Sequence, residues 1–166
     1  MVAFQIEDIK TFTQKLFLGS DFDEFLVKEV NIATFNRFTI DGRVCQGFYS
    51  AEEREQLQPE EFSTWKLLRP VCFSLIKGKK LPGSFRIDLQ MAPGAAEKFL
   101  ENCRIPSMDS QQIKGLHLQI RYEDGKLACI TGTSLAFFTL DKTIETEWDE
   151  FVGQLLKEKG IAAMRH

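Results

Sequence analysis

A short match within the chain places the strongest constraint on its fold. Phe38-Thr-Ile-Asp41 recurs 100 residues later as Phe138-Thr-Leu-Asp141, and a tryptophan that opens an amphipathic stretch closed by glycine follows each copy. Repetition on this scale is typical of one supersecondary unit that is used twice. The alternative is a chance match between two amphipathic segments, because a motif of four residues is short.

The expected secondary structure follows the same repeat. For the first half, apolar periodicity predicts a strand at 2–6, a helix at 9–17, strands at 24–34, 35–40 and 43–49 and a helix at 65–77, and a capping box at Ser50 and Glu53 predicts a short acidic helix that ends before Pro59. For the second half, apolar periodicity predicts a strand at 84–90, a helix at 95–102, strands at 116–122, 127–132 and 135–140 and a helix from 146. This order predicts an α+β fold of two tandem β-α-β-β-β-α halves with antiparallel sheet, and a pseudo-two-fold duplication is one interpretation of it. The halves are 1–83 and 84–166 of a single domain, because Leu81-Pro-Gly83 is too short to separate two cores.

Two Asp-Gly pairs lie between expected strands. Asp41-Gly42 and Asp124-Gly125 both predict type I′ hairpin turns, since these two residue types tolerate the positive φ that both central positions need. The second pair is the stronger signal, because strict alternation of apolar and polar residues flanks it on both sides.

The aromatic residues indicate a buried core. The chain has fifteen phenylalanines against two tyrosines, so most of its aromatic area has no polar group that would favour the surface. Trp65 and Trp148 are each expected to be at least half buried against the sheet. Pro70 lies within the first long helical pattern, so either the helix begins near Pro70 or residues 65–69 form a separate turn.

Charge is distributed unevenly along the chain. The formal net charge is −3, but the segment Phe62 to Ile87 holds six basic residues and no acidic one, which leaves −9 on the rest. Lys77, Lys79, Lys80 and Arg86 within this segment are the candidate residues for binding an anion or an acidic partner. The structural alternative is that lysines just past a helix end neutralise the negative pole of the helix, or pair with the glutamates of the preceding region.

The sequence contains no recognisable catalytic motif. A G-x-S-x-G motif, a P-loop, a G-x-G-x-x-G motif and an H-E-x-x-H motif are all missing, so we assign no catalytic residue and no cofactor. His117 alternates with leucines in an expected strand, and we interpret it as a solvent-facing or hydrogen-bonded strand histidine and not as a general base. The acidic groups at 21–24 and 145–150 lack the spacing of a calcium loop, so no metal site is expected.

The spacing of the cysteines and the length of the apolar segments indicate the cellular compartment in which the protein is expected. Four cysteines are spread 26 to 31 residues apart without a C-x-x-C pair, which favours reduced thiols over a disulfide framework or a zinc site. No apolar run reaches the length of a membrane span, and the first residues lack the basic start of an export signal. We therefore expect a cytoplasmic protein with no membrane partner.

Three segments carry a resemblance to a known family. Phe35-Asn-Arg-Phe-Thr-Ile-Asp-Gly-Arg43, Leu75-Ile-Lys-Gly-Lys-Lys-Leu-Pro82 and Thr131-Gly-Thr-Ser134 followed by Phe138-Thr-Leu-Asp141 resemble a bacterial domain-of-unknown-function family of small proteins. The resemblance covers nearly the whole chain. It implies no activity and no site residues, because that family has none assigned.

The sequence does not identify a function. The best hypothesis is a non-catalytic binding module that engages a polyanion or an acidic protein through the basic segment 66–86. Sequence-specific nucleic-acid binding is not expected, because no aromatic residues are interleaved with the lysines. The alternative is an enzyme whose site lies between the two halves.

Overall fold

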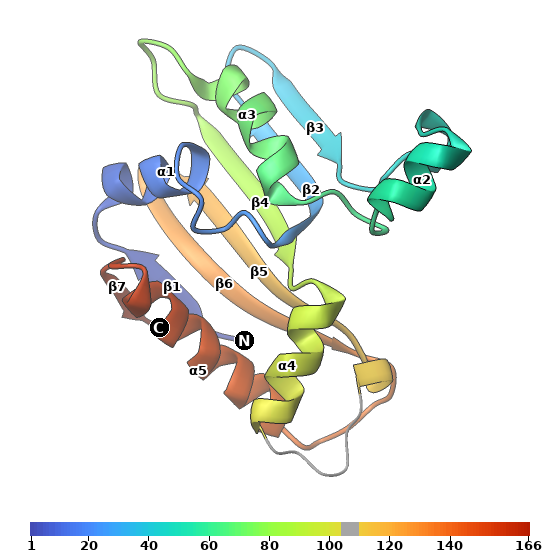
Figure 1. Ribbon diagram of the computed structural model, residues 1–166. Helices are drawn as coiled ribbons and strands as arrows, with labels where there is room; N and C mark the ends of the chain where they lie inside the picture. The colour runs from blue at the N-terminus through green and yellow to red at the C-terminus, as the bar shows by residue number, and fades with distance from the viewer. Residues whose placement is uncertain (104–109) are drawn as a thin grey trace.

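The computed structural model describes residues 1–103 and 110–166 and forms one layer of helices on one sheet (Figure 1). The strands are β1 (Ala3–Ile6), β2 (Leu26–Ala33), β3 (Arg37–Asp41), β4 (Ser84–Gln90), β5 (Ile113–Glu123), β6 (Lys126–Leu135) and β7 (Ala163–Arg165). The α-helices are α1 (Ile9–Phe17), α2 (Ala51–Leu57), α3 (Trp65–Ile76), α4 (Pro93–Cys103) and α5 (Thr143–Glu158), and short 3-10 helices lie at Gln46–Phe48 and Ser110–Gln112.

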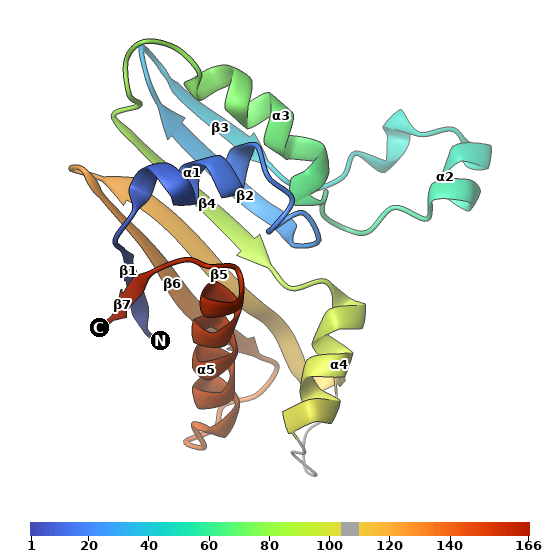
Figure 2. The same cartoon turned by 60° about the vertical axis from the view of Figure 1, so that its left-hand side comes forward.

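The seven strands form a single antiparallel sheet in the order β3-β2-β4-β5-β6-β1-β7. Helices α1 and α3 cover one end of the sheet and α5 and α4 cover the other, all on the same face (Figures 1 and 2). Strand β4 shows the consequence, since Phe85, Ile87 and Leu89 are buried while the residues between them stay partly exposed. We call the face opposite these helices the open face. The chain is thus an α+β protein with antiparallel sheet, as predicted.

The internal duplication is not confirmed. Phe38 lies in β3, whereas Phe138 lies outside the strands in the segment before α5 and is 89% exposed. Trp65 is the first residue of α3, whereas Trp148 lies inside α5. Strand β4 is central between β2 and β5, but β1, its expected equivalent, pairs with β6 and β7. The four-residue match therefore does not mark equivalent positions.

The last of the four strands predicted for each half is wrong. Residues 43–49 contain a single bridge and a 3-10 helix in place of a strand, and β6 runs without a break from 126 to 135 and is followed by irregular chain through 142. Asp124 and Gly125 have the positive φ angles of 52° and 72° that the predicted hairpin needs. Asp41-Gly42 is not such a turn, because Gly42 is buried close to the Val27 carbonyl and neither residue has a positive φ.

Both tryptophans are buried, as predicted, and each indole N–H finds a backbone acceptor. Trp65 Nε1 donates to the Leu16 carbonyl at 2.8 Å, and Trp148 Nε1 donates to the His117 carbonyl at 2.9 Å. Because α1 ends at Phe17, its last carbonyls have no partner within the helix. Trp65 supplies one of the missing donors and thereby ties α3 to α1.

The segment 44–61, which we call the arm, leaves the body of the protein and returns to the same place. Its base is closed by backbone hydrogen bonds from Val44 to Glu61, at 2.9 Å, and from Ser63 to Gly42, at 2.8 Å. Helix α2 lies in the arm, has no buried residue and projects away from the sheet (Figures 1 and 2).

Candidate functional site

Three of the four predicted binding residues lie in one exposed loop. Lys77, Lys79 and Lys80 follow the end of α3, and all three are exposed. None of them forms an ion pair within the described part of the chain, and the glutamates of the arm do not reach them. Within the described ranges, ion pairs therefore do not neutralise the positive charges of this loop.

Arg86, the fourth predicted residue, is engaged elsewhere. It lies in β4 on the open face, where Nη2 donates to Glu29 at 2.9 Å and Nε lies 3.3 Å from Asp88. Arg69 of the same basic segment is likewise paired, since it donates to both carboxylate oxygens of Asp23 at 2.9 and 3.0 Å. The structure thus separates the basic segment into paired arginines and unpaired lysines.

The loop between α3 and β4, which holds Lys77, Lys79 and Lys80, lies beside the turn between β2 and β3, a proximity that the sequence pattern did not reveal. Gly83 donates its N–H to the Ala33 carbonyl at 2.9 Å, which joins the end of the loop to the turn between β2 and β3. Figures 1 and 2 show the loop and this turn side by side at one end of the molecule. The turn presents Phe35, which is 84% exposed, and is followed by the exposed Arg37. We call Lys77, Lys79, Lys80, Phe35 and Arg37 the basic tip.

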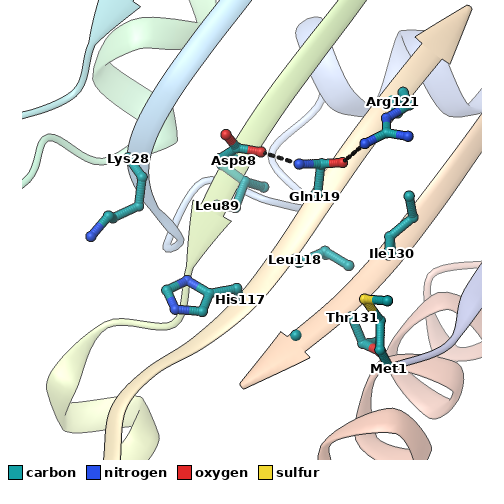
Figure 3. A pocket seen from close by; sticks show the side chains of 11 residues that line it. Met1, Lys28, Asp88, Leu89, His117, Leu118, Gln119, Arg121, Ile130 and Thr131 are labelled. Carbon is teal, nitrogen blue, oxygen red and sulfur yellow. Dashed lines mark hydrogen bonds between the residues drawn. The ribbon is translucent and has the colours of Figure 1, made fainter. Parts of the chain in front are cut away.

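A second candidate site is a hollow of about 560 Å³ on the open face (Figure 3). Its charged and amide side chains and its histidine come from β2, β4 and β5, and they are Lys28, Asp88, His117, Gln119 and Arg121; Thr131 of β6 also lines it. Gln119 lies in the middle of a hydrogen-bond chain, because it donates to Asp88 at 2.8 Å and accepts from Arg121 at 2.6 Å. Alternation along β4 and β5 places Asp88, His117, Gln119 and Arg121 on one face, and it is the signal from which these four could have been found.

The imidazole of His117 packs against the backbone of Gly115. A Cβ on Gly115 would lie only 2.5 Å from His117 Nε2, so the imidazole takes the space that a side chain would fill. The pKa of His117 is lowered, first by burial and then by the positive charge of Lys28, while Asp88 opposes the shift. The lowered pKa favours the neutral form of the imidazole at pH 7. It lies on the open face of a strand, as predicted.

The hollow on the open face offers binding groups but no assembled acid–base chemistry. Asp88 is hydrogen-bonded to Gln119 and ion-paired with Arg86, and no described hydrogen bond links it to His117. The nearby Thr131 hydroxyl is held by the Val2 backbone and by buried Asp149. Within the described ranges, no three His, Cys, Asp or Glu side chains gather as metal ligands would.

A third hollow, of about 810 Å³, lies on the helical side between the two ends of the sheet. It corresponds to the place where the alternative hypothesis puts an enzyme site. Its lining includes Asp21, Asp23 and Glu24, but Asp23 is bound by Arg69 and Asp21 lies 3.8 Å from Lys159. No histidine or cysteine lines this hollow; its titratable lining groups are carboxylates and lysines, and Ser20 and Thr64 add hydroxyls.

Comparison with known proteins gives a family without an assigned function. Among the described residues, no helix is both long and apolar enough to cross a membrane. No curated protein and no solved structure matches the chain. A family model described as "Family of unknown function (DUF5721)" matches residues 15–163, and the chain belongs to that family.

Proposed function

We propose that this protein is a non-catalytic binding module that engages a polyanion through the basic tip, with Lys77, Lys79 and Lys80 as the principal contacts. The observation that carries the proposal is that these three side chains are exposed and unpaired, although the chain as a whole is acidic. Unpaired lysines at an exposed site attract anions at a small desolvation cost, since no internal ion pair has to be broken.

The conformation of the loop supports a role in binding over a role in folding. The end of helix α3 is capped by a backbone hydrogen bond, in which the Lys77 N–H donates to the Phe73 carbonyl at 2.9 Å. No described hydrogen bond joins a lysine side chain to this helix end. Lysines at a helix end gain only about 0.3–1 kcal/mol from the helix dipole. Stability therefore gives little reason for three lysines within four residues.

The chemistry of the basic tip fits recognition of repeated negative charge. Lysine is a compact point charge that contacts a phosphate or a sulfate without reading its surroundings. One exposed aromatic residue, Phe35, does not form a platform on which successive bases could stack. We therefore propose sequence-independent binding, with an acidic protein surface as the alternative partner. A reducing, cytoplasmic setting is part of the proposal, because all four cysteines are free.

The test is a salt titration of binding to a fluorescent DNA duplex of arbitrary sequence and to heparin. We expect affinity to fall steeply with salt, and we expect the K77A/K79A/K80A variant to reduce the slope of log K against log salt on DNA by about 2.7, which is the value for three lost phosphate contacts. The melting temperature should not change. The matched control is K10A/K98A/K157A, which removes three exposed lysines from α1, α4 and α5 and should retain binding.

Three results would contradict the proposal. Absence of binding to both polymers at low salt would exclude a polyanion as the ligand of the basic tip. Equal loss of affinity in the control variant would mean that only overall charge matters. Unfolding of K77A/K79A/K80A would show that the lysines support the end of α3 instead of binding.

A further inference from the structure

The arm is a structured segment whose helix buries no residue against the described part of its own chain. Helix α2 has seven residues and no buried one, and Phe48 and Leu57 of the arm are 83% and 62% exposed. Isolated helices shorter than about 12–15 residues are marginal in water. The capping box, in which Ser50 and Glu53 exchange hydrogen bonds of 3.1 Å, contributes only about 1 kcal/mol. The arm therefore lacks the packing that normally stabilises a helix.

The outer face of α3 exposes apolar side chains that no described part of the chain covers. The residues on the side away from the core form an exposed stripe of Leu67, Pro70, Val71 and Ser74. Leu67 is 58% and Val71 is 50% exposed, which is unusual for apolar residues one helical turn apart. Lys66 and Lys77 stand at the two ends of the stripe, and α3 contains no acidic residue.

Charge distinguishes the two surfaces and makes them complementary. The arm carries five glutamates and one arginine, and described ion pairs engage none of them. Each surface combines exposed apolar side chains with net charge, which is negative on the arm and positive on α3. Surfaces of this kind attract each other, and burial of their apolar residues then supplies the affinity.

We propose that the arm of one copy of this protein docks on the outer face of α3 in a second copy, and that the contact is reciprocal, so that the product is a closed dimer. The base of the arm, at Val44 and Ser63, adjoins the start of α3 at Trp65. In its own chain the arm points away from α3 (Figures 1 and 2). Two copies related by a two-fold axis can therefore each extend an arm across the other's α3, and a contact that repeats itself in this way closes the assembly.

The size of the contact fits a stable interface. The eighteen residues of the arm, together with the exposed stripe of α3, approach the roughly 20–30 residues a side of a standard protein–protein interface. The proposal does not depend on polyanion binding, because its test leaves Lys77, Lys79 and Lys80 unchanged.

The experiment measures the mass of the full chain in solution by light scattering and sedimentation over a range of concentrations at low and high salt. We expect a dimer whose dissociation constant rises with salt. One variant, K66E/S74E, adds acid to the outer face of α3, and a second, E52K/E55K, reverses charge on the arm; each is expected to be monomeric with an unchanged melting temperature. Their equimolar mixture should form a dimer again, because each altered surface then meets one of opposite charge.

Matched variants control for general effects of charge. K10E/Q14E makes similar changes on the exposed face of α1 and should remain dimeric. L67S/V71S should weaken the dimer about tenfold or more, whereas L18S, at a residue that is 59% exposed elsewhere, should not. The proposal is overturned if the unaltered chain is monomeric at tens of micromolar, if the mixture fails to associate, or if the assembly grows beyond a dimer.

Discussion

Replacing Trp65 tests how the two helices over one end of the sheet are joined. The side chain is fully buried, its Nε1 lies 2.8 Å from the Leu16 carbonyl oxygen, and its ring packs edge-to-face with Phe17 at a centroid distance of 5.7 Å. Phenylalanine at this position keeps most of the packing but removes the donor. Since a buried carbonyl left without a partner costs about 1–3 kcal/mol, we expect Trp65→Phe to lower the free energy of unfolding by about 2 kcal/mol.

Trp65→Ala should cost more, because it adds a cavity to the lost hydrogen bond. Truncation of a buried tryptophan costs about 3–5 kcal/mol, and the orphaned carbonyl places this site at the upper end. That loss is a large share of the about 5–15 kcal/mol that stabilises a typical domain.

Urea unfolding followed by far-UV circular dichroism measures both changes without depending on tryptophan fluorescence. Leu18→Ala, at an exposed position beside the same helix end, is the control and should change stability by less than about 0.5 kcal/mol. If Trp65→Phe is as mild as this control, the indole N–H does not cap α1 and the reasoning is wrong.

Two further predictions concern titratable groups. The lowered pKa of His117 means that the unfolded chain binds a proton at this residue more readily than the folded chain does, so the free energy of unfolding should be highest above about pH 6.5 and should fall as the pH drops toward the folded-state pKa. The His117→Gln variant should show a weaker dependence of stability on pH in this range. NMR titration of the native imidazole should show a pKa below about 6.5. Burial raises the pKa of Cys72 to about 12 and also raises the pKa of Cys129, so only exposed Cys45 should react quickly with a thiol reagent, with part-buried Cys103 slower. Equally fast reaction of all four thiols in the folded protein would contradict this order.

The sequence predicted correctly those features that depend only on neighbouring residues. The turn at Asp124-Gly125 was predicted because its residues satisfy a backbone requirement without help from the rest of the chain. The same dipeptide at Asp41-Gly42 led to a wrong prediction. A glycine is needed there because the backbone passes close to the Val27 carbonyl, a contact distant in the sequence, and the chain then continues into the arm. Pro70 also misled, because it lies on the exposed side of α3, where the helix continues through it.

The repeat misled for a different reason. A sequence pattern reports which residues are apolar and at what spacing, but it does not report which strand becomes the neighbour of which. Two segments with the same order of elements are equivalent only if they pair in the same way, and β1 and β4 do not. The match around Phe38 and Phe138 carried no information on pairing, since one lies in an edge strand and the other in no strand.

The candidate site shows the same limit, and here it changes the chemistry. The sequence identified a basic segment with no internal acid, but it could not show that Arg69 and Arg86 are neutralised by carboxylates 46 and 57 residues away. Those arginines serve to hold the fold, and their charge is not available to a partner. No described ion pair joins the lysines of the loop to an acid, so three unpaired positive charges of the segment lie in one loop at one end of the sheet. A segment that reads as uniformly basic is therefore divided by the fold into a structural part and a part able to attract an anion.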